Sequence, residues 1–328
     1  MTMKELAQMA GVSTAAVSRY LNGGSLSPEK REQIRAVIEE TGYQPDAVAQ
    51  MLRTRSTDHV GLIVPKLDSD AVTQVTSGAT AVLAKEGYLC LFADAQNTPE
   101  KELAYLTLFQ NRMVAGIIMM ATVLTPKHED MLRTVNVPMV ITGQRFRQVP
   151  CIYHDDMGAA TELTRLVLRK GRQKPVFIGV TEQDVAVGLN RRRGVQAAMQ
   201  EFGLDPASLP RETSSFEVSG GKAAMERLLQ DHPDCDAVIC ATDRIAFGAM
   251  EALKQAGRRI PEDVSVVGMD DNWACEHVSP TLTTAHFYYR ASGETAARLL
   301  VDMMRKKQQP GPVQQTMLGY TIRERHSI

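Results

Sequence analysis

The chain has 328 residues, 44% of them hydrophobic and 5% aromatic, and its formal net charge is −1 at pH 7. This length predicts two or three domains with sizeable cores, and the small net charge argues against a protein that coats nucleic acid or membranes without selectivity. The five cysteines are scattered and lack CxxC spacing, so we expect buried thiols in a reducing compartment, with no metal site or disulfide.

The N-terminal stretch MTMKELAQMAG lacks the apolar segment of a signal peptide. No run in the chain approaches the roughly 18 apolar residues of a membrane span. We therefore expect a cytoplasmic protein that has no membrane partner.

The first 45 residues predict three short helices around a minimal core. Thr2 and Glu5 fit a capping box for the first helix, and Ser13 can cap the second. Ser27-Pro28 begins the third, because proline is tolerated at the first helical position, and Gly42 ends it.

The second of these helices lies in the stretch GVSTAAVSRYLN, and its outer face is unusual. Val17 and Leu21 are placed to face the core, whereas small side chains and one long cation share the other face. Small residues permit close approach to the floor of the DNA major groove, and Arg19 is long enough for a bidentate contact to guanine. A core helix with an incidental polar face is the alternative. The face consists of Thr14, Ala15, Ser18, Arg19 and Asn22, and Ser13, Ser18 and Asn22 can also bond phosphates.

The following stretch, PDAVAQMLRTRS (residues 45–56), predicts a helix that is too short to be stable alone. A solvated linker is the alternative interpretation. Residues 1–56 carry seven Lys/Arg and six Asp/Glu, so the N-terminal module is only slightly basic. We therefore expect DNA affinity to depend on dimerisation and on this segment.

From His59 onward, short apolar runs alternate with helical segments. Such runs without polar alternation indicate strands covered on both faces, which is typical of parallel α/β sheets. We expect two doubly wound lobes with a ligand cleft at the carboxyl ends of their strands, where Lys66, Asp155-Asp156, Thr242-Asp243 and Asp270-Asp271 follow apolar runs. The runs cover residues 59–65, 88–94, 114–121, 137–143, 151–156, 175–180, 236–243, 264–271 and 281–287.

The stretches MKELAQMAGVSTAAVSRYLNGG, YQPDAVAQMLRTRSTDHVGLIVP, DAVICATDRIAFGAMEALKQAG and IPEDVSVVGMDD resemble the lactose/galactose-repressor family from end to end. This resemblance implies a helix-turn-helix domain (1–45), a hinge helix (46–57) and a two-lobed periplasmic-binding-protein-like core (58–328) that dimerises. We expect the first lobe to cover about 58–155 and 286–314, and the second about 156–285 and 315–328. The crossings near Asp155, near Thr284-Ala285 and in 314–319 would let the lobes rotate.

The same resemblance assigns DNA contacts residue by residue. Thr14, Ala15 and Arg19 correspond to base-reading positions, and Tyr43 belongs to the same interface. Ala49 and Leu52 correspond to the hinge helix, with Leu52 as an apolar wedge in the minor groove. Two departures weaken the expected phosphate contacts: Ala16 replaces a usual threonine, and Asp46 replaces a common asparagine.

For the effector, the resemblance is nearest to the trehalose and sucrose repressors, through PKLDS (65–69), YHDDMGA (153–159), VGLNRR (187–192) and CATD (240–243). Arginines and carboxylates fork well onto vicinal hydroxyls. Lys66, Arg145 and Arg191/Arg192 could instead form a cationic pocket for a sugar phosphate. Both a neutral and a phosphorylated sugar stay open, as do inducer and corepressor roles. The candidate effector residues are Lys66, Arg145, Asp155, Arg191, Phe216, Thr242, Asp270 and Tyr289.

These observations predict an operator-binding regulator, most simply a repressor, of a carbohydrate-utilisation operon, working as a homodimer without a cofactor. An enzyme on the same fold is the main rival, but the chain has no GxGxxG, HExxH or GxSxG motif, and SGGK (219–222) lacks the first P-loop glycine. A solute-binding protein is the second rival, which the N-terminal helices oppose.

Overall fold

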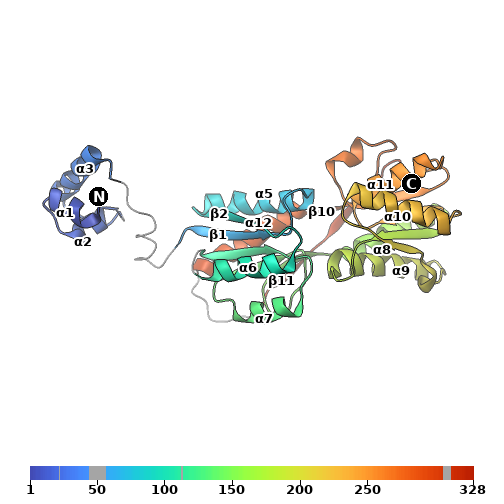
Figure 1. The fold of residues 1–328 in the computed structure, drawn as a ribbon, viewed down its shortest axis with the longest axis horizontal. Helices are drawn as coiled ribbons and strands as arrows, with labels where there is room; N and C mark the ends of the chain where they lie inside the picture. The colour runs from blue at the N-terminus through green and yellow to red at the C-terminus, as the bar shows by residue number, and fades with distance from the viewer. Residues whose placement is uncertain (22, 44–56, 112–113, 306–311) are drawn as a thin grey trace. The chain divides into compact units, whose positions relative to one another are not determined.

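The computed structural model describes residues 1–21, 23–43, 57–111, 114–305 and 312–328, and the chain divides into two compact units, Met1–Thr57 and Asp58–Ile328 (Figure 1). In the described residues, no helix is long and apolar enough to cross a membrane. The five cysteines are free thiols, and four are buried as expected, whereas Cys90 is half-buried.

The first unit contains α1 (Met3–Met9), α2 (Thr14–Leu21) and α3 (Pro28–Thr41). Thr2 and Glu5 form the predicted capping box, with Thr2 N donating to Glu5 Oε2 over 2.7 Å. Ser13 Oγ accepts from Ala16 N at 3.3 Å, so this serine does cap α2. The helices enclose a small core of Leu6, Ala7, Ala10, Val17 and Ile34.

The second unit has two lobes, and each contains a six-stranded sheet with helices on both faces. The first-lobe sheet has the order β11-β5-β4-β3-β1-β2, and its pairs are parallel. In this register Ile63 of β1 lies opposite Ala93 of β2 and Met119 of β3. The elements are β1 (His59–Val64), α5 (Asp70–Lys85), β2 (Leu89–Asp94), α6 (Pro99–Gln110), β3 (Gly116–Met120), α7 (Pro126–Thr134), β4 (Met139–Thr142), β5 (Cys151–His154), α12 (Tyr289–Arg305) and β11 (Gln315–Leu318).

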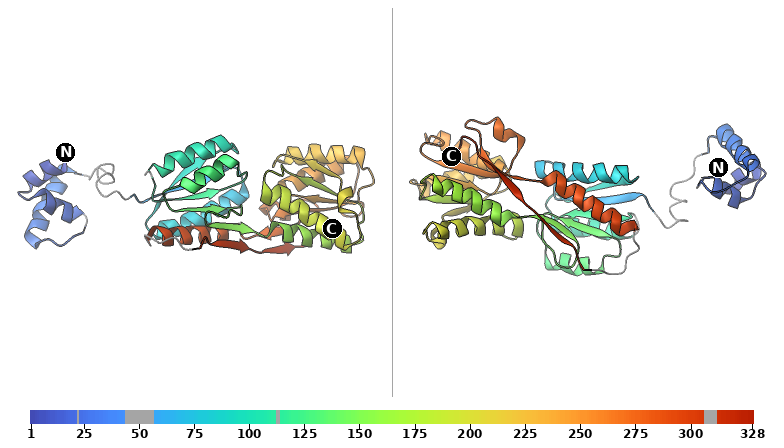
Figure 2. Two further views of the ribbon diagram at one scale, coloured as in Figure 1. Left: turned by 90° about the horizontal axis from the view of Figure 1, so that it is seen from below. Right: turned by 180° about the vertical axis from the view of Figure 1, so that it is seen from behind.

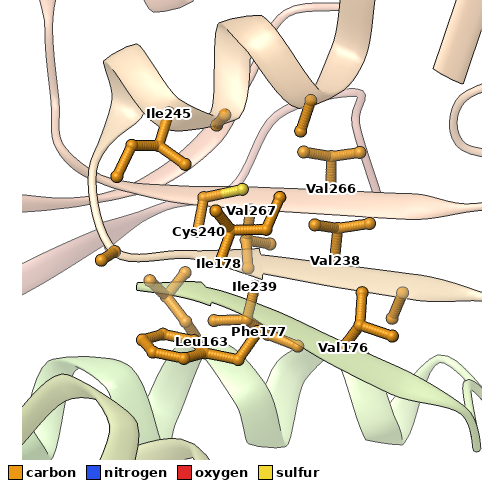
Figure 3. Close-up of a cluster of buried hydrophobic side chains, with 14 of the residues drawn as sticks. Leu163, Val176, Phe177, Ile178, Val238, Ile239, Cys240, Ile245, Val266 and Val267 are labelled. Atoms are coloured by element: carbon orange, nitrogen blue, oxygen red, sulfur yellow. The ribbon is translucent and has the colours of Figure 1, made fainter. Parts of the chain in front are cut away.

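The second-lobe sheet has the order β12-β10-β9-β8-β6-β7, and only the edge pair of β10 with β12 is antiparallel among its described pairs. Figure 3 shows its core, in which side chains of neighbouring strands such as Val238 and Val266 pack between helices on both faces. The elements are α8 (Asp156–Arg169), β6 (Pro175–Gly179), a π-helical segment (Val185–Asn190), α9 (Arg191–Glu201), a 3₁₀ turn (Pro206–Ser208), β7 (Arg211–Thr213), α10 (Val218–Asp231), β8 (Ala237–Cys240), α11 (Asp243–Gln255), β9 (Ser265–Asp270), a 3₁₀ turn (Trp273–Glu276), β10 (Thr283–Phe287) and β12 (Tyr320–Arg323).

The lobe boundaries differ from the sequence-based ones in two respects. The crossing expected near Thr284-Ala285 falls inside β10, which stays in the second-lobe sheet as far as Phe287. The strand β11 was expected in the second lobe, but it pairs in parallel with β5 of the first lobe. The chain therefore crosses between the lobes at Asp155, at Tyr288 and at Gly319, immediately before β12. The C-terminal segments, drawn in orange to red, run along both lobes (Figure 2). The third crossing is thus a single residue between two strands.

Candidate functional site

The exposed face of α2 is the candidate DNA-reading surface of the first unit. Thr14, Ala15 and Arg19 are exposed, and Ser13 is exposed at the start of the helix. Among the other predicted DNA contacts, Ser18 is half-buried, and Tyr43 is half-buried because it packs on the helical core. Ala16 is only 5% exposed, so the departure from threonine at this position falls on the core side of the helix. Asn22, Ala49 and Leu52 lie outside the described residues.

The second unit contains a cavity of about 140 Å³ between the two lobes, at the carboxyl ends of their strands. Both sheets change strand order here, between β1 and β3 and between β6 and β8, as expected for a ligand site in doubly wound sheets. The first lobe contributes residues that follow β1, β3, β4 and β5, and the second lobe contributes the π-helical segment, a feature that is frequent at functional sites. The lining includes Lys66, Ser69, Asn97, Met120, Thr122, Thr142, Gln144, His154, Asp156, Asp184, Ala186, Val187, Arg191, Phe216 and Tyr289.

Arg191 is the central charged group of the cavity wall. It begins α9 and is 2% exposed, and its Nε donates to Asp156 Oδ1 at 2.8 Å. Its Nη1 lies 3.2 Å from Asp270 Oδ1 and also donates to the carbonyl oxygen of Ala241. The guanidinium lies over the ring of Phe287, 4.8 Å from its centroid. Although burial opposes its charge, the carboxylates of Asp156 and Asp270 raise the pKa of Arg191 well above its ordinary value, so it stays cationic.

Asp270 acts behind Arg191, since it does not line the cavity. It is the last residue of β9, and its Oδ1 accepts from the hydroxyl of Tyr289 at 2.6 Å. Its backbone has φ +124°, a conformation that non-glycine residues rarely adopt. Burial raises the pKa of Asp270, and its bonds to Arg191 and Tyr289 act in the opposite direction. We therefore assign Asp270 a positioning role toward Arg191 and Tyr289.

Asp243 fixes the loop that follows Asp270. Its carboxylate is fully buried and accepts from Asn272 N at 2.7 Å and from the hydroxyl of Thr284 at 2.6 Å. Burial and the nearby Asp270 raise the pKa of Asp243 to about 7. The side chain of Asn272 in turn donates to Asp70 of the first lobe.

Further polar contacts join the lobes around the cavity. Lys66 of the first lobe lies 2.8 Å from Glu217 Oε1 of the second lobe. Gln144 of the first lobe donates from Nε2 to Asp184 Oδ1 at 2.7 Å, and its Oε1 accepts from Ala186 N at 3.2 Å. Because these groups belong to different lobes, any rotation of one lobe against the other must change these distances.

Burial raises the pKa of Asp184 to about 6. The hydrogen bonds from Val187 N and Gln144 lower the pKa, but the effect of burial is larger. The folded state therefore binds the proton of the Asp184 carboxyl group more tightly than the unfolded chain does. Asp184 contributes stability at low pH that is lost as the pH rises through about 6. Asparagine mimics the protonated form, so Asp184→Asn should stabilise the core by about 1–3 kcal/mol at pH 8, and the gain should shrink as the pH falls toward 4. Denaturant unfolding of the full chain across this pH range measures it.

Asp205→Asn is the matched control for this prediction. Asp205 also accepts from a backbone N–H at a helix start, that of Ala207 at 2.9 Å, but it is exposed. We expect no pH-dependent gain from this control. A gain for Asp184→Asn that was equal at pH 5 and pH 8 would contradict the role of its ionisation.

The predicted effector residues separate into two groups. Lys66, Arg191, Phe216 and Tyr289 line the cavity. Arg145, Asp155, Thr242 and Asp270 are not among the residues that line it, and their contact with an effector stays a prediction.

The structure shows where each of these four side chains is engaged instead. Arg145 is exposed and donates from Nε to Gln315 Oε1 at 2.9 Å. Asp155 accepts from Gly158 N at 2.9 Å and Thr242 from Ile245 N at 3.3 Å, so both cap helices, and Asp270 is turned to Arg191.

Sequence reasoning missed Gln144, Asp184 and His154 as cavity residues. Gln144 and His154 lie at or just beyond the ends of predicted strands, so the rule that ligands bind at carboxyl ends of strands could have found them. Asp184 lies in the loop after the predicted strand 175–180, so the same rule indicates its loop, although it does not single out this residue. In the described residues, no group of three or more His, Cys, Asp or Glu could hold a metal ion.

The sequence matches two known protein-family models and a bacterial repressor. Residues 2–46 match the sequence model described as "Bacterial regulatory proteins, lacI family", and residues 164–328 match the "Periplasmic binding protein-like domain". The chain is 31% identical to the sucrose operon repressor of Staphylococcus xylosus over 300 residues, which is 92% of each protein.

Solved structures agree in fold. The structure described as "transcriptional regulator CelR-cellobiose complex" superposes with a TM-score of 0.75 at 28% identity, over 100% of this chain and 99% of that one. The lac repressor dimer bound to operator superposes with a TM-score of 0.85 over 100% of this chain and 98% of that one, and at 22% identity this likeness concerns the fold alone.

Proposed function

The chain belongs to the LacI family of bacterial regulatory proteins, and from this premise we propose that a neutral sugar bound between its two lobes controls its binding to operator DNA. Transcriptional regulation through operator DNA follows from the helix-turn-helix unit and from the repressors to which the chain is similar along 92% of its length. The target is a carbohydrate-utilisation operon, and the protein acts in the cytoplasm, where that DNA is.

The observation that carries the choice of a neutral ligand is the charge of the cavity. Its two cations, Lys66 and Arg191, are already paired with carboxylates of Glu217, Asp156 and Asp270. Asp184 adds a further carboxyl group to the wall. A phosphate dianion would therefore have to displace these carboxylates or lie beside them, which costs free energy in a buried site. A neutral polyhydroxy ligand can bond to the same groups without that cost.

The cationic pocket considered for a sugar phosphate loses one of its members, because Arg145 lies outside the cavity. The similarity to the CelR-cellobiose complex is a further argument for a neutral sugar, since that complex superposes over the whole of this chain. Aromatic side chains of Phe216 and Tyr289 in the cavity wall suit the apolar faces of sugar rings.

Control of DNA binding would follow from rotation of the lobes about the three crossings. A sugar that bonds to both lobes favours one rotation by its difference in affinity for the two states. We propose a homodimer on a pseudo-palindrome, because one short and weakly basic reading head offers few contacts and two heads double them.

Gel shift with DNA from upstream of a neighbouring sugar operon tests the proposal. Retardation should respond to a neutral sugar, with sucrose and cellobiose as the first probes, and not to glucose 6-phosphate at equal concentration. A response to the phosphorylated sugar alone would contradict the neutral effector. Failure to retard any of these fragments more than random DNA would contradict sequence-specific regulation.

A further inference from the structure

Two buried polar atoms in the cavity wall have no hydrogen-bond partner among the described residues. They are Oγ1 of Thr142 and Nε2 of His154, whose residues are 1% and 8% exposed. Buried polar groups in native proteins are almost always paired, so such exceptions need an explanation. Both residues belong to the effector cavity, where a ligand could supply the missing bonds.

The register of the first-lobe sheet places the two side chains on one face. Thr142 of β4 lies opposite Ile152 of β5, and His154 lies two residues further along β5. Because side chains alternate between the faces of a strand, Ile152 and His154 share a face with Thr142. The two polar side chains are therefore near neighbours at the carboxyl ends of adjacent strands.

The surroundings of His154 determine what its free nitrogen can do. The ring centroid lies 5.1 Å from that of Tyr289 and 5.2 Å from that of Phe287. Burial lowers the pKa of His154 to about 4, so the ring is neutral at physiological pH, although a hydrogen bond to the backbone of Tyr288 acts in the opposite direction. Because Nε2 has no partner, we assign the single ring proton to Nδ1, which leaves Nε2 as an acceptor.

We propose that Thr142 and His154 form a hydroxyl-recognition subsite, in which a ligand O–H donates to Nε2 of His154 and the Thr142 hydroxyl bonds to the same part of the ligand. This inference rests on the proposed function and deepens it, because it states which ligand chemistry fits this wall of the cavity. A hydroxyl can donate and accept, whereas a phosphate dianion has no proton to donate. The subsite thus selects a sugar that places a free hydroxyl here.

The first test measures the thermal midpoint of the full chain without added sugar. Thr142→Val replaces an unpaired buried hydroxyl with a methyl group of the same shape, so Tm should rise by about 2–4 °C. Thr164→Val is the matched control, because the Thr164 hydroxyl is equally buried but donates to the Ala160 carbonyl at 2.7 Å, and its removal should lower Tm. A lowered Tm for Thr142→Val would mean that its hydroxyl stabilises the core, which overturns the proposal.

The second test measures binding of sucrose and cellobiose by calorimetry. Thr142→Val and His154→Phe should each lower the affinity for the sugar that the wild type binds by about 10- to 100-fold, because each variant removes a hydrogen bond to a ligand hydroxyl. The phenylalanine keeps an aromatic ring at position 154. Unchanged affinity in both variants would overturn the subsite while leaving the neutral effector intact. Binding of glucose 6-phosphate alone by the wild type would contradict the proposed function, and the Tm comparison would still decide whether Thr142 is unpaired.

Discussion

Replacing Arg191 with methionine is expected to abolish the effect of sugar on operator binding. The variant leaves the buried Asp156 and the half-buried Asp270 without the cation that both contact, at 2.8 Å and 3.2 Å. The sugar loses a charged hydrogen-bond donor in the cavity wall, and a hydrogen bond to a charged group contributes about 1.5–3 kcal/mol, so sugar affinity should fall by about 10-fold or more. Calorimetry with the bound sugar, and operator affinity with and without it, measure both effects.

The loss of stability must be separated from the loss of binding. Breaking a buried pair destabilises a protein by about 3–5 kcal/mol, so unfolding of the core should be measured alongside. Arg193→Met is the matched control, because Arg193 lies on the same helix but is exposed. Arg191→Lys keeps the positive charge but lacks the planar guanidinium that bonds to several acceptors at once. This variant should therefore restore stability more fully than it restores sugar affinity. Wild-type sugar affinity in a folded Arg191→Met protein would contradict the assignment of Arg191 as a sugar-binding residue.

Much of the fold could be predicted because apolar runs reveal strands that are covered on both faces. The nine runs from 59–65 to 281–287 all contain strands of the structure. The short polar strands β7 and β12 were missed, since RET and YTIR carry no apolar run. Likewise β11 was placed in the wrong lobe, because the sequence of a strand does not state which neighbour it pairs with.

Site residues could be predicted where a single position matches the family pattern. Arg191 and Tyr289 were identified from the family resemblance, and both line the cavity. Gln144 and Asp184 were missed because their role is a contact between lobes, 40 residues apart in the chain. His154 matters through the loss of solvent around its ring and the partner of its other nitrogen, and neither property can be read from the sequence.

Arg19→Ala is expected to have the largest effect on DNA recognition. Arg19 is the exposed long donor on the reading face of α2, beside the exposed Thr14 and Ala15. A bidentate arginine–guanine contact contributes about 1–3 kcal/mol of discrimination, and a dimer makes it in both half-sites. Operator affinity should therefore fall by about 30-fold or more, whereas affinity for random DNA should change little.

The measurement compares the operator, a variant operator with one guanine replaced in each half-site, and random DNA, each at two salt concentrations. If Arg19 reads that guanine, the Arg19→Ala protein should no longer distinguish the first two, and the salt dependence of binding should stay close to that of the wild type. Arg35→Ala is the control, because this exposed arginine of α3 is paired with Glu32 at 2.6 Å and lies off the reading face. An equal loss on all three DNAs, with a weaker salt dependence, would make Arg19 a phosphate contact, and base recognition would then have to come from other residues of the reading face.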